Sequence, residues 1–400
     1  MNTRLKLIAL ILCGQMGSFS LYAEETLINQ APSAQLQNRP IVIPAPPAIN
    51  AKEYILIDVQ SGKVLADKNS EVSAPPASLT KMMTLYVISN ALAHNQIHLS
   101  DLVRISKDAW QAEGSRMFVK EGQMVSIEDL VKGIIVDSGN DACIAMAEHL
   151  GGSEPGFSQI MNDQAKALGM QHSYFTDSTG LPNEKLQTTA KDLAILGRAL
   201  ILNFPQYYPW YQQKWFKFND IRQPNRNRLL WRDASVDGLK TGHTDDAGFC
   251  LVSSAKQDNM RLLAVVLGEP TDAMRADDSQ KLLNYGFRFY ETHQMFKANQ
   301  TIKTLPVYKG ESITVAAGVT QAVYATVPKG QYAHLQVETE VSKTLQAPIQ
   351  QGEVVGQIRL IYDQKVLARY PLQALQPINK GGVFTRMKDS MKLTFIRWFG

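Results

Sequence analysis

Cysteine is scarce in this sequence, which has only Cys13, Cys143 and Cys250 among its 400 residues. So few thiols exclude a small domain that is held together by several disulfides. Cys143 lies in an apolar run with helical spacing, and Cys250 lies in a run typical of a strand. Two interpretations therefore stay open for these two residues, a single bridge between them or two buried free thiols.

Strong charge of one sign is lacking as well. A formal net charge of +4 is too small to indicate nucleic-acid binding. His94 and His98 have helical spacing, but no glutamate follows the first histidine as it does in zinc proteases. We expect both histidines to be solvated, and the sequence predicts neither a metal ion nor another cofactor.

Residues 1–23 have the pattern of a secretory signal peptide, with a buried N-terminal helix as the alternative. Arg4 and Lys6 come before a short apolar core, Leu7–Leu12, which is too short to span a bilayer. Ala23 ends the segment at a plausible cleavage site. Residues 24–50 are rich in proline and predict an extended leader.

Apolar periodicity divides the rest of the chain into two domains and a tail. In residues 51–291, strand-like runs near both ends, such as 54–59 and 261–267, enclose a mostly helical middle. We expect an α/β domain in which both ends form one antiparallel sheet and a helical subdomain is inserted between them. Residues 292–382 contain short alternating runs separated by turns, which predict a small all-β domain.

The tail, residues 383–400, predicts an amphipathic helix. Its large apolar side chains fall on one stripe at helical spacing, namely Phe384, Met387, Met391, Phe395 and Trp398. Four basic residues against one acid make the segment cationic, which favours a helix lying in a membrane interface. Leu393 and Ile396 lie off the stripe, so docking on the protein's own core is the alternative.

Three short motifs carry chemistry, and the first is Ser78-Leu79-Thr80-Lys81. A serine hydroxyl needs a base to become a nucleophile, and positions i and i+3 share a helix face, so Lys81 can reach Ser78. Burial near another cation would lower the pKa of this lysine and let it act as the base. Ser253-Ser254-Ala255-Lys256 repeats the pattern, but it falls in a predicted strand, where the two residues face opposite ways.

The second motif is Ser138-Gly139-Asn140, in a predicted loop before a helix. A hydroxyl and an amide on one tight loop can relay a proton and orient a substrate amide. Taken alone, the tripeptide would be interpreted as a loop or a helix cap.

The third motif is Lys240-Thr241-Gly242, on a predicted strand. Such a strand offers backbone groups to an extended substrate. We expect Lys240 and Thr241 to bind a substrate carboxylate, while Gly242 lets the substrate approach closely. The backbone N–H of His243, together with that of Ser78, is a candidate oxyanion hole.

In this order and these contexts the motifs resemble those of the low-molecular-mass penicillin-binding proteins of the D-alanyl-D-alanine carboxypeptidase type. The stretches 172–175, 179–181 and 237–244 support the resemblance, which covers nearly the whole mature chain. It implies a penicillin-recognising transpeptidase-like domain, a β-rich domain and a membrane-anchoring helix at residues 383–400. It also implies an exported enzyme on the periplasmic face of the inner membrane, without a cofactor or nucleic-acid partner.

The resemblance further implies an activity and its residues. The enzyme would remove the terminal D-alanine from peptidoglycan stem peptides and would be acylated by β-lactam antibiotics. Ser78 would be the nucleophile and Lys81 its base. The remaining roles would be proton relay and substrate binding, by Ser138, Asn140, Lys240, Thr241, Gly242 and His243.

Three alternative functions stay open. A DD-endopeptidase of the same superfamily differs little in sequence. A β-lactamase of class A usually has Glu-x-x-Leu-Asn between the second and third motifs, and none lies between Asn140 and Lys240. A non-catalytic peptidoglycan-binding protein would not need the intact Ser78 and Lys81.

Overall fold

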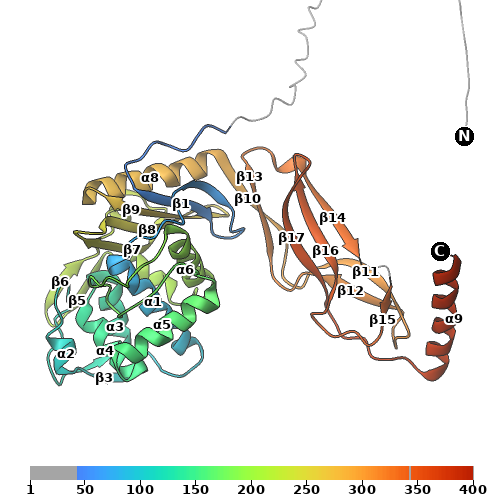
Figure 1. The fold of residues 1–400 in the computed structure, drawn as a ribbon, viewed down its shortest axis with the longest axis horizontal. Helices are drawn as coiled ribbons and strands as arrows, with labels where there is room; N and C mark the ends of the chain where they lie inside the picture. The colour runs from blue at the N-terminus through green and yellow to red at the C-terminus, as the bar shows by residue number, and fades with distance from the viewer. Residues whose placement is uncertain (1–42, 342–343, 400) are drawn as a thin grey trace, which may run out of the picture. The chain divides into compact units, whose positions relative to one another are not determined.

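The computed structural model describes residues 43–341 and 344–399 (Figure 1). The predicted signal peptide and most of the predicted leader lie outside these ranges. Residues 43–50 contain no helix or strand, yet they are held against the catalytic domain. Tyr285 donates a hydrogen bond to the Pro44 carbonyl at 3.0 Å, and the Asn50 N–H donates to the Asp278 carboxylate at 2.8 Å.

A five-stranded antiparallel sheet, in the order β2-β1-β9-β8-β7, forms the centre of the first domain. Its strands are β1 (Glu53–Asp58), β2 (Val64–Lys68), β7 (Val236–Thr244), β8 (Gly248–Gln257) and β9 (Met260–Glu269). Ile55 of β1 lies opposite Val265 of β9. The two ends of the domain therefore form one sheet, as the sequence predicts.

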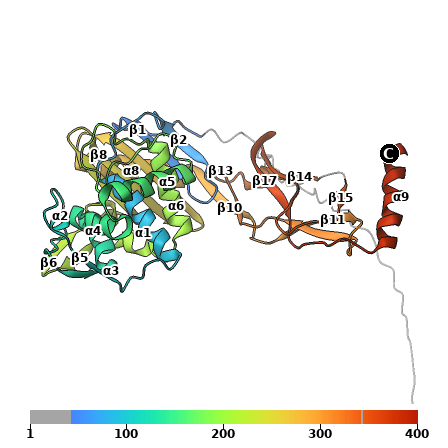
Figure 2. The ribbon, with the colours of Figure 1, turned by 60° about the horizontal axis from the view of Figure 1, so that its bottom comes forward.

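Side chains alternate across this sheet and build a core on each face. In β9, Leu262, Ala264 and Val266 belong to one buried cluster, and Leu263, Val265 and Leu267 to the other, as the two-residue period of a strand requires. Helix α8 (Asp272–Phe289) packs on the first face. Helices α1 (Lys81–Ala93) and α6 (Ala190–Asn203) pack on the second (Figure 2).

The inserted middle is less helical than its sequence predicts. Its helices are α2 (Lys107–Trp110), α3 (Ile127–Lys132), α4 (Asn140–Gly151), α5 (Glu154–Leu168) and α7 (Leu229–Arg232). Two hairpins interrupt them, formed by β3 (Leu102–Arg104) with β4 (Met124–Ser126) and by β5 (Trp215–Phe218) with β6 (Ile221–Pro224). Strands of three or four residues are too short to show a period in sequence.

The helix that the sequence predicts from Ser78 to Ala93 is divided. A 3-10 turn covers Ala77–Thr80, and α1 begins only at Lys81. Ala77 has φ +49°, a left-handed conformation that is unusual for a residue with a Cβ. The chain therefore enters the turn sharply just before Ser78.

The second domain is all-β. Its six-stranded sheet has the order β14-β16-β17-β12-β11-β15, and β10 pairs with β13. The strands are β10 (Tyr290–Phe296), β11 (Thr301–Tyr308), β12 (Thr314–Gly318), β13 (Val323–Pro328), β14 (Leu335–Val341), β15 (Leu345–Gln346), β16 (Val354–Tyr362) and β17 (Lys365–Ala374). One apolar cluster, including Val315, Ile358 and Leu372, fills its interior. The predicted fold class is confirmed.

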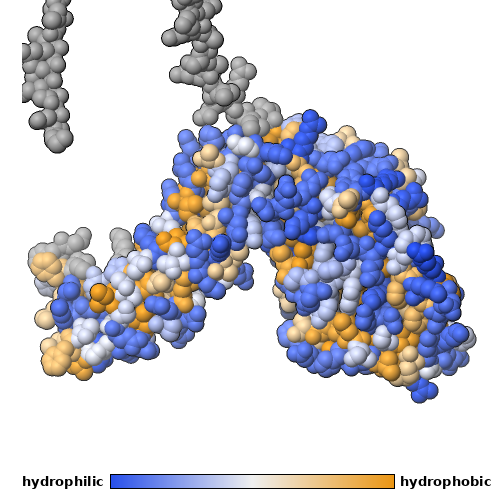
Figure 3. All heavy atoms as spheres, turned by 180° about the vertical axis from the view of Figure 1, so that it is seen from behind, coloured by the Kyte–Doolittle hydropathy of each residue, from blue (hydrophilic) through white to orange (hydrophobic). Residues whose placement is uncertain are grey.

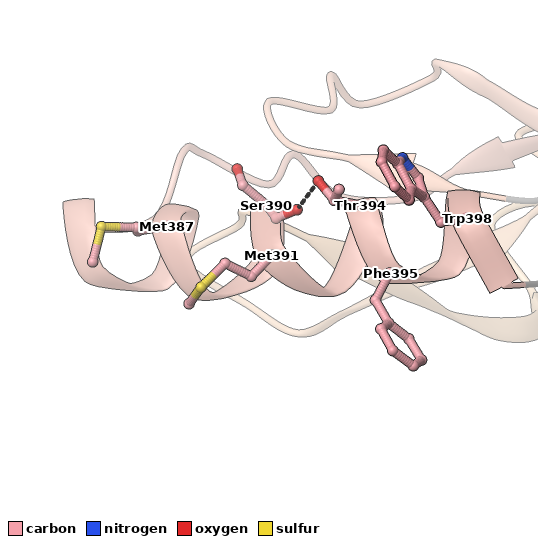
Figure 4. A pocket seen from close by; sticks show the side chains of 6 residues that line it. All are labelled: Met387, Ser390, Met391, Thr394, Phe395 and Trp398. Carbon is pink, nitrogen blue, oxygen red and sulfur yellow. Dashed lines mark hydrogen bonds between the residues drawn. The ribbon is translucent and has the colours of Figure 1, made fainter.

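Helix α9 (Val383–Phe399) follows the β domain. The predicted stripe is exposed, from 58% at Met387 to 85% at Phe384, and Figure 4 shows Met387, Met391, Phe395 and Trp398 projecting from the helix. Asp389 accepts a hydrogen bond from the Lys309 N–H at 2.7 Å, and Leu393 is half-buried. The helix thus contacts the β domain through Asp389 and leaves the stripe open.

No helix in residues 43–341 and 344–399 is long and apolar enough to cross a membrane.

Candidate active site

The first motif brings a hydroxyl and an amine together. Lys81 Nζ lies 2.9 Å from Ser78 Oγ and 2.6 Å from the Thr179 carbonyl oxygen. The lysine side chain is fully buried, and this burial lowers its pKa, with Arg226 adding to the effect. A lysine with a lowered pKa is the form that can accept a proton.

The loop that supplies the Thr179 carbonyl is held tightly against the 3-10 turn. The Asp177 carboxylate accepts hydrogen bonds from the N–H groups of Thr179 and Gly180, at 2.8 and 2.7 Å. Gly180 has φ +83°, and a Cβ there would lie 1.9 Å from the Ala77 carbonyl oxygen. Only glycine fits this position, so the loop fixes where the amine of Lys81 lies.

Ser138 ends a π-helical turn over Gly133–Asp137 and adopts a left-handed conformation, with φ +58°. Such turns often occur at functional sites. The Lys240 Nζ donates to Ser138 Oγ at 3.0 Å and to the Thr241 carbonyl at 2.9 Å. The second and third motifs, 102 residues apart in sequence, thus meet through a direct hydrogen bond.

Asn140 begins α4, whereas the sequence predicts it within a loop. Its side-chain Nδ2 donates to the Glu113 carbonyl at 2.6 Å, and its N–H donates to the Ser115 carbonyl at 2.6 Å. Next to it, Asp141 accepts hydrogen bonds from the N–H groups of Met117 and Phe118. The turn after Ser138 therefore holds the segment from residue 113 to 118 in place.

Strand β7, the edge strand of the sheet, carries the third motif. A Cβ at Gly242 would lie 3.0 Å from the Pro76 carbonyl and 3.2 Å from the Leu79 nitrogen. The glycine therefore lets the strand pack closely on the turn that holds Ser78. The exposed His243 ring stacks on Phe249, with 3.9 Å between ring centroids.

One cavity of about 500 Å³ joins these parts. Ser78, Ser138, Thr241, Gly242 and His243 line it. Lys81, Asn140 and Lys240 are buried behind the lining. The geometry thus places Lys240 against Ser138, with Thr241 on the cavity surface and the lysine behind it.

Three arginines in the cavity wall were missed from the sequence, namely Arg226, Arg228 and Arg275. Arg275 Nη1 donates to the Gly242 carbonyl at 3.0 Å, and Arg226 Nη1 donates to Ser115 Oγ at 2.7 Å. Arg228 and Arg275 both pair with Asp272, the acid in the lining. The cavity is therefore cationic and suits a ligand with a carboxylate.

Burial and neighbouring charges shift the pKa values of several other groups in this region. Desolvation lowers the pKa of Lys240 well below its usual value, and the neighbouring Lys81 adds to this. Burial raises the pKa of Asp137, beside Ser138, to about 7. Cys143 and Cys250 are both free and buried, and burial raises the pKa of the Cys143 thiol to about 12. Neither thiol is therefore available as a nucleophile.

Within the described parts of the chain, no group of three or more histidine, cysteine or acidic side chains is placed to hold a metal ion.

Comparison with known proteins places this geometry in a family. Residues 41–271 match the D-alanyl-D-alanine carboxypeptidase family, and residues 290–380 match the C-terminal domain of penicillin-binding protein 5. The chain is 44% identical to the D-alanyl-D-alanine carboxypeptidases DacC and DacA of Escherichia coli. These matches cover 88% and 90% of this chain and 90% and 91% of the relatives.

Solved structures agree with this family match. Penicillin-binding protein 5 from Haemophilus influenzae superposes with a TM-score of 0.79 at 40% identity, over 84% of this chain and all of that one. Penicillin-binding protein D2 from Listeria monocytogenes, solved with ampicillin bound, matches 61% of this chain with a TM-score of 0.56 at 27% identity. The chain belongs to the D-alanyl-D-alanine carboxypeptidase family.

Proposed function

We propose that the protein is a serine-type D-Ala-D-Ala carboxypeptidase that removes the terminal D-alanine from peptidoglycan pentapeptides. The observation that carries the proposal is the placement of Ser78 Oγ, 2.9 Å from a buried amine, in a cationic cavity. A nucleophile, a base and a carboxylate-binding wall are the three parts that this hydrolysis needs. Family membership supports the same reaction.

In the first step Ser78 Oγ attacks the carbonyl carbon of the D-Ala–D-Ala bond, and the neutral Lys81 amine takes the hydroxyl proton. The backbone N–H groups of Ser78 and His243 are the proposed donors to the oxyanion. The C–N bond then breaks, and the proton that Lys81 took passes through Ser138 to the leaving nitrogen, which leaves Lys81 neutral again. D-alanine departs and an ester remains on Ser78.

In the second step water attacks the ester carbonyl. Lys81 again takes a proton, and Ser78 regains its hydroxyl as the shortened peptide leaves. A β-lactam would undergo the first step only, because the attack of Ser78 opens its ring and the ester that forms is stable. A structural relative has been solved with ampicillin bound, which supports this susceptibility.

The substrate's terminal carboxylate is proposed to bind where the cavity is most cationic. Thr241 donates a hydrogen bond there, and Arg226 and Arg275 supply charge from two other segments. Lys240 supports the site from behind, through Ser138. Asn140 and Gly242 position the groups that touch the substrate.

The lining favours a peptidase over a β-lactamase. A β-lactamase needs a group that activates the deacylating water. The acid among the lining residues, Asp272, is committed to Arg228 and Arg275. Nearby Glu154 accepts hydrogen bonds from Ser178 with both oxygens. Among the described lining residues, no acid is therefore left unpaired to serve, in addition to Lys81, as a dedicated base for the deacylation of penicillin.

Release of free D-alanine tests the assignment against its closest rival. We expect the purified enzyme to release D-alanine from a pentapeptide at least about tenfold faster than it cleaves a cross-linked muropeptide dimer. In the dimer the leaving amine belongs to a whole second stem peptide, which is far bulkier than a single D-alanine in a cavity of about 500 Å³. Faster cleavage of the dimer would make the enzyme an endopeptidase instead.

We also propose that the enzyme is exported and lies on the periplasmic face of the inner membrane. The signal pattern of residues 1–23 supports export. The cationic α9, whose apolar stripe is open, supports peripheral attachment.

Deleting residues 383–400 tests the membrane proposal. We expect most of the signal-processed protein to move from the membrane fraction to the soluble fraction, with D-alanine release unchanged. The full-length Met391→Glu variant, which places a charge on the stripe, should be released in part. Membrane association that survives the deletion would show that another segment holds the protein.

A further inference from the structure

An aromatic platform stands beside the active-site cavity. It consists of Trp215 on β5, Trp231 on α7 and Arg222 on β6. The tryptophans are 46% and 43% exposed, with ring centroids 6.1 Å apart and planes at 86°. The Arg222 guanidinium lies 4.4 Å from the Trp215 ring centroid. Exposed apolar groups that adjoin one another, unlike single ones, often mark an interaction site.

The platform is continuous with the cavity wall. Trp215 pairs across the hairpin with Pro224, which lines the cavity. Trp231 lies in the short helix that follows Arg228, another lining residue. A ligand in the cavity and a ligand on the platform would therefore be neighbours.

Hydrogen bonds fasten the platform to both walls of the site. Gln223 Nε2 donates to the Arg116 carbonyl at 2.8 Å, which ties the hairpin to the segment held by Asn140. Asn227 Nδ2 donates to the Gly238 carbonyl of β7 at 2.9 Å, and Asn227 Oδ1 accepts from the Leu229 N–H that begins α7. The hairpin and the short helix that carry the two rings are thus anchored to the walls of the site.

Other exposed apolar groups are scattered over the catalytic domain, as the face drawn in Figure 3 illustrates. Trp110, on α2, is 41% exposed but pairs with no other aromatic ring among the described residues. The platform differs because two perpendicular rings and a guanidinium meet at one place. Rings bind the apolar faces of sugars, and guanidinium N–H groups bind sugar hydroxyl and carbonyl oxygens.

We propose that this platform binds the glycan strand of peptidoglycan, with N-acetylated sugar rings against Trp215 and Trp231. The inference rests on the proposed activity toward stem peptides. Four residues separate the scissile bond from the sugar, and they span at most about 14 Å. Glycan, from the same strand or from a neighbouring one, therefore always accompanies the peptide that enters the cavity.

The test compares a pentapeptide with the same pentapeptide on its disaccharide. We expect the wild type to release D-alanine from the glycan-bearing substrate with a kcat/KM about tenfold higher, through a lower KM. In the double variant Trp215→Ala/Trp231→Ala this ratio should fall to about one. Trp110→Ala, a change of the same size at an equally exposed tryptophan, should keep the ratio.

Direct binding gives a second readout. A peptide-free tetrasaccharide of the glycan strand should quench the tryptophan fluorescence of the wild type and of Trp110→Ala, but not of the double variant. The rate of labelling by fluorescent penicillin checks that each variant is folded. A double variant that keeps both the ratio and the quenching would overturn the proposal. An enzyme that releases no D-alanine from either substrate would instead overturn the proposed function.

Discussion

Replacing Ser78 by alanine is expected to abolish covalent labelling by a fluorescent penicillin and to lower kcat for D-alanine release by about 10⁴-fold or more. The hydroxyl is the atom that forms the ester, and Cys143 and Cys250 are buried and protonated, so neither can replace it. Labelling on a denaturing gel and D-alanine release measure the two effects. Labelling of the variant at the wild-type rate would show that another residue is the nucleophile.

The second copy of the motif offers a matched control. Ser253 lies in β8, fully buried, and its hydroxyl has no hydrogen-bond partner. Ser253→Ala removes the same atom from a serine followed by a lysine three residues later. We expect full labelling and a Tm that is unchanged or higher, because a buried hydroxyl without a partner has a desolvation cost that no hydrogen bond offsets. Loss of labelling in this variant would show that the nucleophile has been assigned to the wrong serine.

Replacing Lys81 by methionine is expected to lower the rate of acylation about 10³- to 10⁴-fold. Methionine fills nearly the same volume but accepts no proton. The fold should survive, because removing a buried amine also removes its desolvation cost, although the Thr179 carbonyl loses its 2.6 Å partner. Stopped-flow acylation by a chromogenic cephalosporin measures the rate, and thermal unfolding checks the fold.

The direction in which the acylation rate changes with pH identifies the base. Burial lowers the pKa of Lys81, and only the neutral amine accepts a proton. The acylation rate of the wild type should therefore rise as the pH rises through that pKa. This rise with pH should be absent in Lys81→Met. Lys256→Met, at the exposed lysine of the second copy, should keep it. If the rate still rises with pH in Lys81→Met, another group is the base.

Local rules were sufficient to predict the parts of the site that lie within one short motif. The i, i+3 spacing of Ser78 and Lys81 brings them together even though a 3-10 turn replaces the first turn of the predicted helix. The prediction that Ser253 lies in a strand is confirmed, because the apolar run of β8 is visible in the sequence. The predicted sheet, built from both ends of the domain, followed from where strand-like runs occur.

The cavity wall could not be predicted in the same way. Arg226 and Arg275 come from a loop and from α8, and neither belongs to a motif, so only the tertiary fold brings them together. Lys240 was predicted to bind a substrate carboxylate, and the hydrogen bond that its amine donates to Ser138 could not be foreseen from either motif. The roles assigned to the individual residues stay predictions until the variants are measured.

The position of β7 at the end of its sheet has a consequence for solubility. An unpaired strand edge is a template on which other chains can assemble into aggregates. Here three carbonyl groups of the strand, at Gly238, Thr241 and Gly242, already accept hydrogen bonds from Asn227, Lys240 and Arg275. The side chains that shape the site thus take up part of the hydrogen-bonding capacity of the strand, which leaves less of it for a foreign strand.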